Sequence, residues 1–249
     1  GVTKADLAEQ FGHHVAELVD GLTKLDKLRF SSRQENQAES FRKMLLAMAN
    51  DVRVILIKLA DRSHNMRTMS DMKRDAQIRI ATETIEIYAP IANRLGLDRT
   101  FRELENFSFK FLHPWRYEVL SKALERARSR RRHLLQEVLQ NAENAFASAG
   151  LAGRFKAREK TVFSIYRKMA KKNNNFAQVN DIYAFRIIVP NLLDCYTALG
   201  ILHQLYKPVP QRLKDFIAIP KDNGYQSLHT TLIGPAGVYV EFQVRTDAM

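Results

Sequence analysis

The sequence has one cysteine in 249 residues, Cys195. A lone cysteine excludes a framework of intrachain disulfides and is typical of a reducing compartment, so we expect a cytoplasmic protein. No apolar run approaches the roughly 20 residues of a membrane span, and the start carries no signal-peptide core, so no membrane partner is expected. Residue 1 is not Met, so it need not be a natural N-terminus. No Walker-A pattern or glycine-rich kinase loop is present, which makes the common NTPase and kinase folds poor candidates.

Acidic residues are scarce relative to basic ones. There are 39 Lys and Arg against 27 Asp and Glu, a formal net charge of +12. Residues 151–249 hold 14 of the basic and 7 of the acidic residues, so more than half of the excess lies there. Such an excess favours a polyanionic partner: RNA, an acidic membrane face or a nucleotide polyphosphate. Composition alone does not choose among them.

Residues 1 to about 148 have the pattern of successive helices. Apolar residues recur at helical spacing over 36–50 and over 75–96, where Pro90 should interrupt the pattern and Gly96 should end it. A long helix is predicted from residue 120 until Gly150 stops it. Its segment ARSRRRH, residues 127–133, is either an RNA-binding patch or a solvated face.

After Gly150 the pattern changes to strands interspersed with helices. The predicted strands are DIYAFRIIVP, DFIAIP, SLHTTLIG and VYVEFQVRT, and the predicted helix is CYTALGILHQLY. This order indicates an α+β fold, with an all-helical N-terminal part followed by a mixed sheet with flanking helices. The composition shift places the boundary between Leu112 and Gly150, and we set the domains at 1–112 and 113–249.

Two clusters in this second half suit a bound phosphate and a metal. In AREKTVFSIYRKM, Ser164 and Lys168 lie one helical turn apart near a helix start, which suits phosphate oxygens, although basic amphipathic helices are common. Asp181, at the head of a strand, is either an oxygen ligand of the kind that Mg²⁺ prefers or a turn residue.

Two further clusters suit a base and a catalytic group. Lys214 and Lys221 bracket a predicted strand, and the nearby Tyr225 is either a ring on which a base can stack or a core residue. Strand alternation puts Glu241, Gln243 and Arg245 on one face of EFQVRT. Metal, polyphosphate and base held together are the parts that phosphoryl transfer needs.

The motifs SIYRKM, DIYAFRIIV, RLKDFIAIPKDNGYQSLHTT and EFQVRT, in this order and at this spacing, resemble the RelA/SpoT-type (p)ppGpp synthetases. Upstream, VRVILIKLADRSHNMRTM is similar to the end of the HD-type hydrolase domain of the long members, so the resemblance covers essentially the whole chain. RLKD resembles the basic version found in bifunctional, SpoT-like members. Ala157 and Gln211 stand where the family usually has glycine.

The resemblance implies a nucleotidyltransferase-like synthetase domain with GTP diphosphokinase activity. It would transfer pyrophosphate from ATP to the 3′-hydroxyl of GDP or GTP, with Mg²⁺, in the stringent response. The implied ATP-binding residues are Arg158, Lys160, Ser164, Lys168 and Arg186. The implied GDP- or GTP-binding residues are Lys214, Lys221, Asn223, Tyr225 and His229. Asp181 and Glu241 would be the catalytic and Mg²⁺-binding residues.

The helical part would be the C-terminal portion of a (p)ppGpp hydrolase domain. Asp61 matches a Mn²⁺ ligand of that domain, and Arg62, Asn65 and Thr68 match its nucleotide pocket. The other Mn²⁺ ligands of the family are expected before residue 1, so we expect Mn²⁺ only in the intact hydrolase and no hydrolase activity in this chain. The family usually continues beyond Met249, so the synthetase domain is expected to be clipped, and modules further downstream would contact the ribosome or regulatory proteins.

Two other classes of function stay open. One is a non-catalytic module that binds RNA or the ribosome through its charge, which salt should weaken steeply. The other is a regulatory protein that binds ppGpp without making it, which needs Tyr225 and the lysines but not Glu241.

Overall fold

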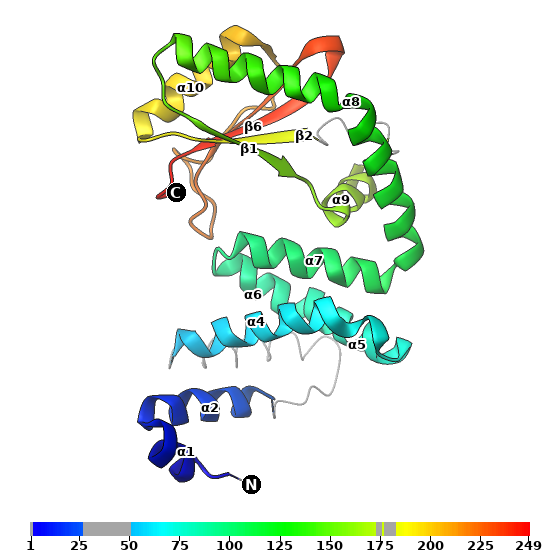
Figure 1. Ribbon diagram of the computed structural model, residues 1–249, viewed down its shortest axis with the longest axis vertical. Coiled ribbons are helices and arrows are strands. Elements are labelled where there is room, and N and C mark those ends of the chain that lie inside the picture. Colours follow the sequence, from blue (N-terminus) through cyan, green and yellow to red (C-terminus); the bar gives the residue numbers. More distant parts are fainter. Residues whose placement is uncertain (1, 27–50, 173–175, 177–182) are drawn as a thin grey trace. The chain divides into compact units, whose positions relative to one another are not determined.

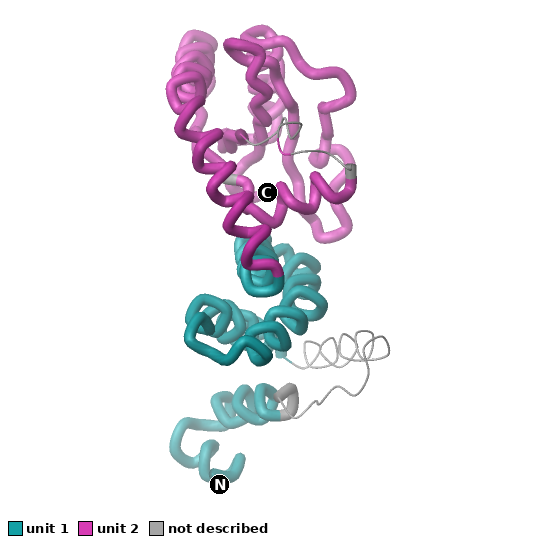
Figure 2. The backbone as a smooth tube through the Cα atoms, turned by 90° about the vertical axis from the view of Figure 1, so that its right-hand side faces the viewer, with its two compact units in different colours: residues 1–112 teal, residues 113–249 magenta. Residues whose placement is uncertain are grey.

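The computed structural model describes residues 2–26, 51–172, 176 and 183–249. It divides the chain into two compact units, Gly1–Leu112 and His113–Met249 (Figure 2). In the described part of the chain, no helix is both long and apolar enough to span a membrane. The helix expected over residues 36–50 lies outside the described residues.

The first unit is helical throughout its described part. Its elements are α1 (Lys4–Phe11), α2 (His13–Asp26), α4 (Val52–Thr68), the 3₁₀ turn η1 (Met69–Asp71), α5 (Arg74–Glu83), the π-helix η2 (Thr84–Tyr88), α6 (Ala89–Arg94) and α7 (Asp98–Leu112). Leu59 and Met66 of α4 pack in one apolar core with Ile91 of α6 and Leu104 of α7.

Pro90 and Gly96 act as predicted on the helix over 75–96. Pro90 lies in the first turn of α6, directly after the π-helix, so the regular α-helical ladder is interrupted there. Gly96 has φ 71°, a left-handed conformation that glycine adopts without strain, and the helix ends before it.

The second unit combines helices with a six-stranded sheet (Figure 1). Its elements are α8 (Pro114–Ser148), β1 (Arg154–Glu159), α9 (Val162–Lys172), β2 (Tyr183–Ile188), α10 (Leu192–Leu205), β3 (Lys207–Pro208), β4 (Lys214–Asp215), β5 (Leu228–Ile233), η4 (Pro235–Gly237) and β6 (Tyr239–Arg245). The strand order is β1-β2-β6-β5-β3, with β4 also paired to β5. Only β2 and β6 are parallel among these pairs, so the sheet is mixed.

Helices α8 and α10 cover the apolar face of the sheet. Phe146 of α8 meets Phe155 of β1 edge to face, with ring centroids 5.0 Å apart. On α10, the Nε2 atom of His203 lies 2.9 Å from Oγ1 of Thr230 on β5. Phe242 of β6 is fully buried on this face. The predicted α+β fold, a helical HD region followed by a mixed sheet with helices, is confirmed.

One sequence-based prediction of a strand fails, and the strands β1 and β3 were not predicted. Of DFIAIP, residues 215–220, only Asp215 lies in a strand, β4. Oδ1 of Asp215 accepts bonds from the backbone N–H groups of Ile217 and Ala218 and bends the chain into a turn. Lys214 therefore lies in the short strand β4 and Lys221 follows the turn, so the two lysines do not bracket a strand. The sequence pattern also missed β1, whose charged residues conceal a strand at the edge of the sheet.

Candidate active site

The register of the sheet gathers polar side chains on the face opposite α10. Arg186, Gln243 and His229 are direct cross-strand neighbours on β2, β6 and β5. Two residues away along the strands, the next row contains Arg158 and Glu241. Because side chains alternate between faces, all five lie on one face of the sheet. The predicted placement of Glu241, Gln243 and Arg245 on a common face is thus what the register shows.

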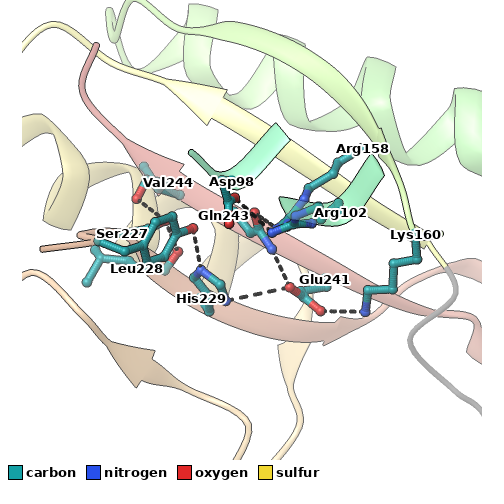
Figure 3. Close-up of polar contacts among 11 residues, drawn as sticks. Asp98, Arg102, Arg158, Lys160, Ser227, Leu228, His229, Glu241, Gln243 and Val244 are labelled. Carbon is teal, nitrogen blue, oxygen red and sulfur yellow. Dashed lines mark hydrogen bonds and ion pairs between the residues drawn. The ribbon is translucent and has the colours of Figure 1, made fainter. Parts of the chain in front are cut away.

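Glu241 is at the centre of a set of hydrogen bonds (Figure 3). Its Oε2 accepts a bond from Nζ of Lys160 at 2.8 Å, and its Oε1 accepts one from Nε2 of Gln243 at 2.5 Å. Nδ1 of His229 lies 3.6 Å from Oε1. Burial, the largest single influence, raises the pKa of Glu241, but Lys160, Gln243 and His229 together outweigh it and lower the pKa to about 2. The carboxylate is therefore ionised at neutral pH.

Gln243 also connects Glu241 to Arg158. Its side-chain oxygen accepts a bond from NH1 of Arg158, so the two residues are joined although they are 85 positions apart in the sequence. Arg186 adds a second guanidinium to this face. Its Nε is buried and finds no hydrogen-bond partner within the described residues. Arg158 and Arg186 thus bring two planar cations to neighbouring strands.

Lys160 and the start of α9 form one end of the site. Oγ1 of Thr161 accepts a bond from the backbone N–H of Ser164, and the two hydroxyl oxygens lie 2.8 Å apart, so Thr161 caps the helix. Lys168 follows Ser164 by one turn. Burial lowers the pKa of Lys168, as does the charge of Lys160, to about 7. Two amines and two hydroxyls thus lie near one helix start.

Aromatic rings and cations gather at the other end. Tyr225 has its hydroxyl 2.9 Å from Nε2 of His229, and Phe216 meets the His229 ring edge to face with centroids 5.2 Å apart. Nζ of Lys221 lies 4.9 Å and Cζ of Arg245 lies 5.3 Å from the centroid of the Tyr225 ring. Tyr225 is half-buried and outside the strands, so it is not the core strand residue of the alternative interpretation.

The imidazole of His229 is neutral at physiological pH. Burial lowers the pKa of His229 to about 4, against the opposing effect of the Glu241 charge. A neutral ring carries one N–H, and the nearby carboxylate favours the tautomer with the hydrogen on Nδ1. Nε2 then accepts a bond from the hydroxyl of Tyr225. His229 thereby joins Tyr225 to Glu241.

A tight turn and a short strand place the remaining predicted residues. Gly224 has φ 75° and donates its N–H to the carbonyl of Lys221 at 2.8 Å, and Oδ1 of Asn223 accepts a bond from the N–H of Tyr225. Lys214 pairs with His229 across β4 and β5. The predicted residues Lys214, Lys221 and Asn223 are thus all next to Tyr225 or His229.

Of the two predicted Mg²⁺ ligands, only Glu241 belongs to the part of the chain that is described. Asp181 lies outside the described residues, and no group of three His, Cys, Asp or Glu side chains there is arranged to hold a metal. The donor type of Glu241 fits Mg²⁺, because a carboxylate oxygen is the hard ligand that this ion takes when phosphates supply others.

The predicted hydrolase residues lie on α4 in the first unit. Asp61, Asn65 and Thr68 are exposed and follow one another at helical spacing, and Asn65 donates to Oδ1 of Asp61 at 3.3 Å. Arg62 differs from them. Its NH1 lies 3.0 Å from a carboxylate oxygen of Glu83, its guanidinium lies 4.1 Å from the ring centroid of Tyr88, and its side chain is 11% exposed.

Gln243, Arg245 and Phe216 are the members of the site to which the sequence assigned no role. For Gln243 and Arg245 the signal was available, because both share the polar face of EFQVRT with Glu241. Phe216 had no such signal, since its place beside His229 depends on the turn at Asp215.

Two family models match parts of the chain. Residues 1–98 match the model described as an HD domain. Residues 157–249, which contain the described site of the second unit, match the model described as a region found in RelA / SpoT proteins.

Two relatives match nearly the whole chain. Over 99% of this chain, the guanosine-3′,5′-bis(diphosphate) 3′-pyrophosphohydrolase of Haemophilus influenzae is 53% identical, and the bifunctional (p)ppGpp synthase/hydrolase SpoT of Escherichia coli is 52% identical. The chain spans only 36% and 35% of those two proteins. Among solved structures, the small alarmone synthetase 1 of Bacillus subtilis is 26% identical, with a TM-score of 0.43 over 50% of this chain and 72% of that one.

Proposed function

Because the chain belongs to the RelA/SpoT family, we propose that its second unit synthesises (p)ppGpp from ATP and GDP or GTP. The observation that supports this most is the position of Glu241. An ionised, mostly buried carboxylate lies between a cluster of amines and guanidinium groups on one side and the Tyr225–His229 pair on the other. The phosphates of ATP would lie on the side of the cations, and the guanine base of the acceptor nucleotide would lie on the side of Tyr225, with Glu241 between them.

The reaction would form a bond between the 3′-oxygen of the guanosine nucleotide and the β-phosphorus of ATP. The bond between that phosphorus and the oxygen bridging to the α-phosphorus would break, and AMP would leave. Glu241 would accept the proton of the 3′-hydroxyl or orient that hydroxyl. Most of the catalysis in such transfers comes from positioning and charge neutralisation, which a face rich in cations can provide.

The donor would bind at the end formed by β1, β2 and α9. Arg158 and Arg186 would contact the two faces of adenine, because planar guanidinium groups stack on aromatic rings. Lys160, Ser164 and Lys168 would bind phosphate oxygens, which suits amines and a hydroxyl near a helix start.

The acceptor would bind at the end formed by residues 214–229. Tyr225 would stack on guanine, and its hydroxyl bond to His229 would hold the ring in place. Lys214 and Lys221 would meet phosphates, with Asn223 closing the turn beside them.

Mg²⁺ is the metal that the proposal implies. Glu241, with Asp181 as the second predicted ligand, would hold the ion, which supplies charge neutralisation at the transferred phosphates when bound. In this free chain Lys160 neutralises the carboxylate.

The experiment is to incubate the purified chain with ATP, GDP and Mg²⁺ and to look for AMP and ppGpp in equal amounts. Omission of Mg²⁺ and replacement of GDP by ADP are the controls for metal dependence and base selectivity. A chain that binds nucleotide but makes neither product would contradict the enzyme and support the regulatory alternative. Binding only to RNA, lost between low and moderate salt, would support the charge-driven module.

For the first unit we propose a part of a (p)ppGpp 3′-pyrophosphohydrolase. Asp61, Asn65 and Thr68 share the exposed surface of α4, as residues of a pocket should. Asp61 alone does not make a Mn²⁺ site, which usually needs several protein ligands, so no metal-dependent step is assigned to it here.

A further inference from the structure

Gln243 is almost completely buried in the candidate site, with 1% of its surface exposed. It lies on β6, between its cross-strand neighbours Arg186 and His229. Burial of an amide is costly unless its oxygen and its nitrogen both find partners. Gln243 therefore depends on the two groups that it contacts, Arg158 and Glu241.

The chemistry of those partners fixes the direction of the amide. A guanidinium can only donate hydrogen bonds, and an ionised carboxylate can only accept them. The oxygen of Gln243 must therefore face Arg158, and its NH₂ group must face Oε1 of Glu241. In the reverse orientation the NH₂ would meet another donor and the amide oxygen would meet a negative oxygen. Glutamine thus supplies one acceptor and one donor where each is required.

The consequence is that Glu241 is held from two sides. Lys160 binds Oε2 at 2.8 Å, while Gln243 binds Oε1 at 2.5 Å. Lys160 is also a predicted ligand of the donor phosphates, so its bond to Glu241 competes with substrate. Gln243 is buried beneath the surface of the site, and its bond to Glu241 need not break when nucleotides bind.

We propose that Gln243 is a positioning residue that orients the carboxylate of Glu241 toward the 3′-hydroxyl of the acceptor. The inference rests on the proposed synthesis of (p)ppGpp. Gln243 would touch neither nucleotide, and it would act on the rate of transfer through Glu241. Because Gln243 also bonds to Arg158, it connects Glu241 to a residue proposed to bind ATP.

Two substitutions separate this role from simple packing. Gln243→Met keeps the length of the side chain and removes both hydrogen bonds. Gln243→Glu keeps an acceptor for Arg158 but offers no amide donor to Glu241. Misplacement of a catalytic group by about 1 Å costs on the order of 100-fold in rate, so kcat should fall roughly 10- to 100-fold in both variants. The KM values for ATP and GDP should stay within about threefold of the wild-type values, since the binding groups remain.

The control is Gln140→Met on α8, where the exposed Gln140 amide donates a hydrogen bond to Oδ1 of Asn144 on the same helix, and its kcat should not change. Circular dichroism and the melting temperature identify a variant that does not fold. If Gln243→Met is unfolded, Gln243→Glu decides.

A wild-type kcat in folded Gln243→Glu would overturn the positioning of Glu241, because only the bond to Arg158 would then matter. A rise in the KM for ATP with unchanged kcat would overturn it as well. If the wild-type chain makes no ppGpp, the proposed function fails and this inference fails with it. If the wild type is active and the variants keep its kcat, only this inference fails.

Discussion

At the scale of the residue, the site combines groups whose ionisation is set by their neighbours. Glu241 stays charged although it is mostly buried, because Lys160, Gln243 and His229 together outweigh the desolvation that raises its pKa. His229 is neutral because burial, helped by the charges of nearby lysines, lowers its pKa to about 4. The ionised Glu241 could therefore orient the 3′-hydroxyl of the acceptor while His229 stays neutral.

Substitution of Glu241 should separate turnover from binding. Glu241→Gln keeps the shape but removes the charge, so kcat should fall by two decades or more, on the order of 3 kcal/mol of transition-state stabilisation. The affinities for ATP and GDP should change far less. Steady-state kinetics and nucleotide titrations measure both. Glu118→Gln, at an exposed ion pair with Lys122, is the matched control. Near-normal ppGpp synthesis by folded Glu241→Gln would show that the carboxylate is not catalytic.

Substitution of Tyr225 should affect one nucleotide only. Stacking of a base on an aromatic ring contributes ~1–3 kcal/mol, so Tyr225→Ala should raise the KM for GDP roughly tenfold and leave that for ATP nearly unchanged. Tyr225→Phe should rescue this in part, because it keeps the ring but loses the bond to His229. Equal losses for ATP and GDP would instead favour a packing role.

Lys168 should make stability depend on pH. Its pKa in the folded chain is about 7, against an ordinary 10.5, because the folded chain buries the ammonium group. Below about pH 7 the amine is charged in both the folded and the unfolded chain, and the folded chain bears the full free-energy cost of burying that charge. Between about 7 and 10.5 only the unfolded state holds the proton, so this cost declines as pH rises.

Lys168→Met should therefore raise the melting temperature at pH 6 and raise it progressively less toward pH 10. Lys171→Met, at an exposed position of the same helix, is the control. A stabilisation by Lys168→Met that does not vary with pH would contradict the buried charge.

At the scale of the element, the N-terminal cap of α9 stabilises the helix that carries Ser164 and Lys168 of the proposed phosphate site. Thr161 satisfies the N–H of Ser164, and loss of such a cap typically costs ~1 kcal/mol. Thr161→Ala should lower the melting temperature by roughly 2–5 °C and raise the KM for ATP, because Ser164 and Lys168 lie on the first turns of the frayed helix. Thr161→Ser should restore both. A loss of stability with an unchanged KM for ATP would place the cap outside the donor site.

Elements with a strong local signal were predictable from the sequence. Gly150, at φ 67°, follows α8 as expected, and β5 and β6 lie within the predicted strands SLHTTLIG and VYVEFQVRT. The turn after β4 was not predictable, because one side-chain oxygen of Asp215 determines whether this segment forms a strand or a turn. Gln211 has φ 60°, a left-handed conformation that suits the glycine usual in the family.

Contacts within the site were less predictable than its members. The residue types of the polar face were evident, but Arg158 meets Gln243 only because β1 pairs with β2 and β2 pairs in parallel with β6. A parallel pair joins segments distant in the sequence, and no local pattern encodes its partner. The role of Gln243 follows from that pairing.

At the scale of the whole molecule, each unit has its own core. The cluster around Leu59, Met66 and Leu104 lies entirely within Gly1–Leu112. Phe146, Leu202 and Phe242 are buried within His113–Met249. All described residues proposed for (p)ppGpp synthesis belong to the second unit, and those proposed for the hydrolase belong to the first. Division of labour between units with separate cores is common, since each can fold around its own apolar interior.

The fragment 113–249 should therefore fold and act without the helical unit. It has 137 residues by its bounds, enough for an ordinary domain with one core. We expect a cooperative thermal transition and ppGpp synthesis within about tenfold of the rate of the 249-residue chain, because the described donor, acceptor and catalytic groups are all retained. Calorimetry and the assay with ATP, GDP and Mg²⁺ measure these, with Glu241→Gln in the fragment as the inactive control. A folded fragment that makes no ppGpp, beside a longer chain that does, would show that the helical unit contributes to synthesis.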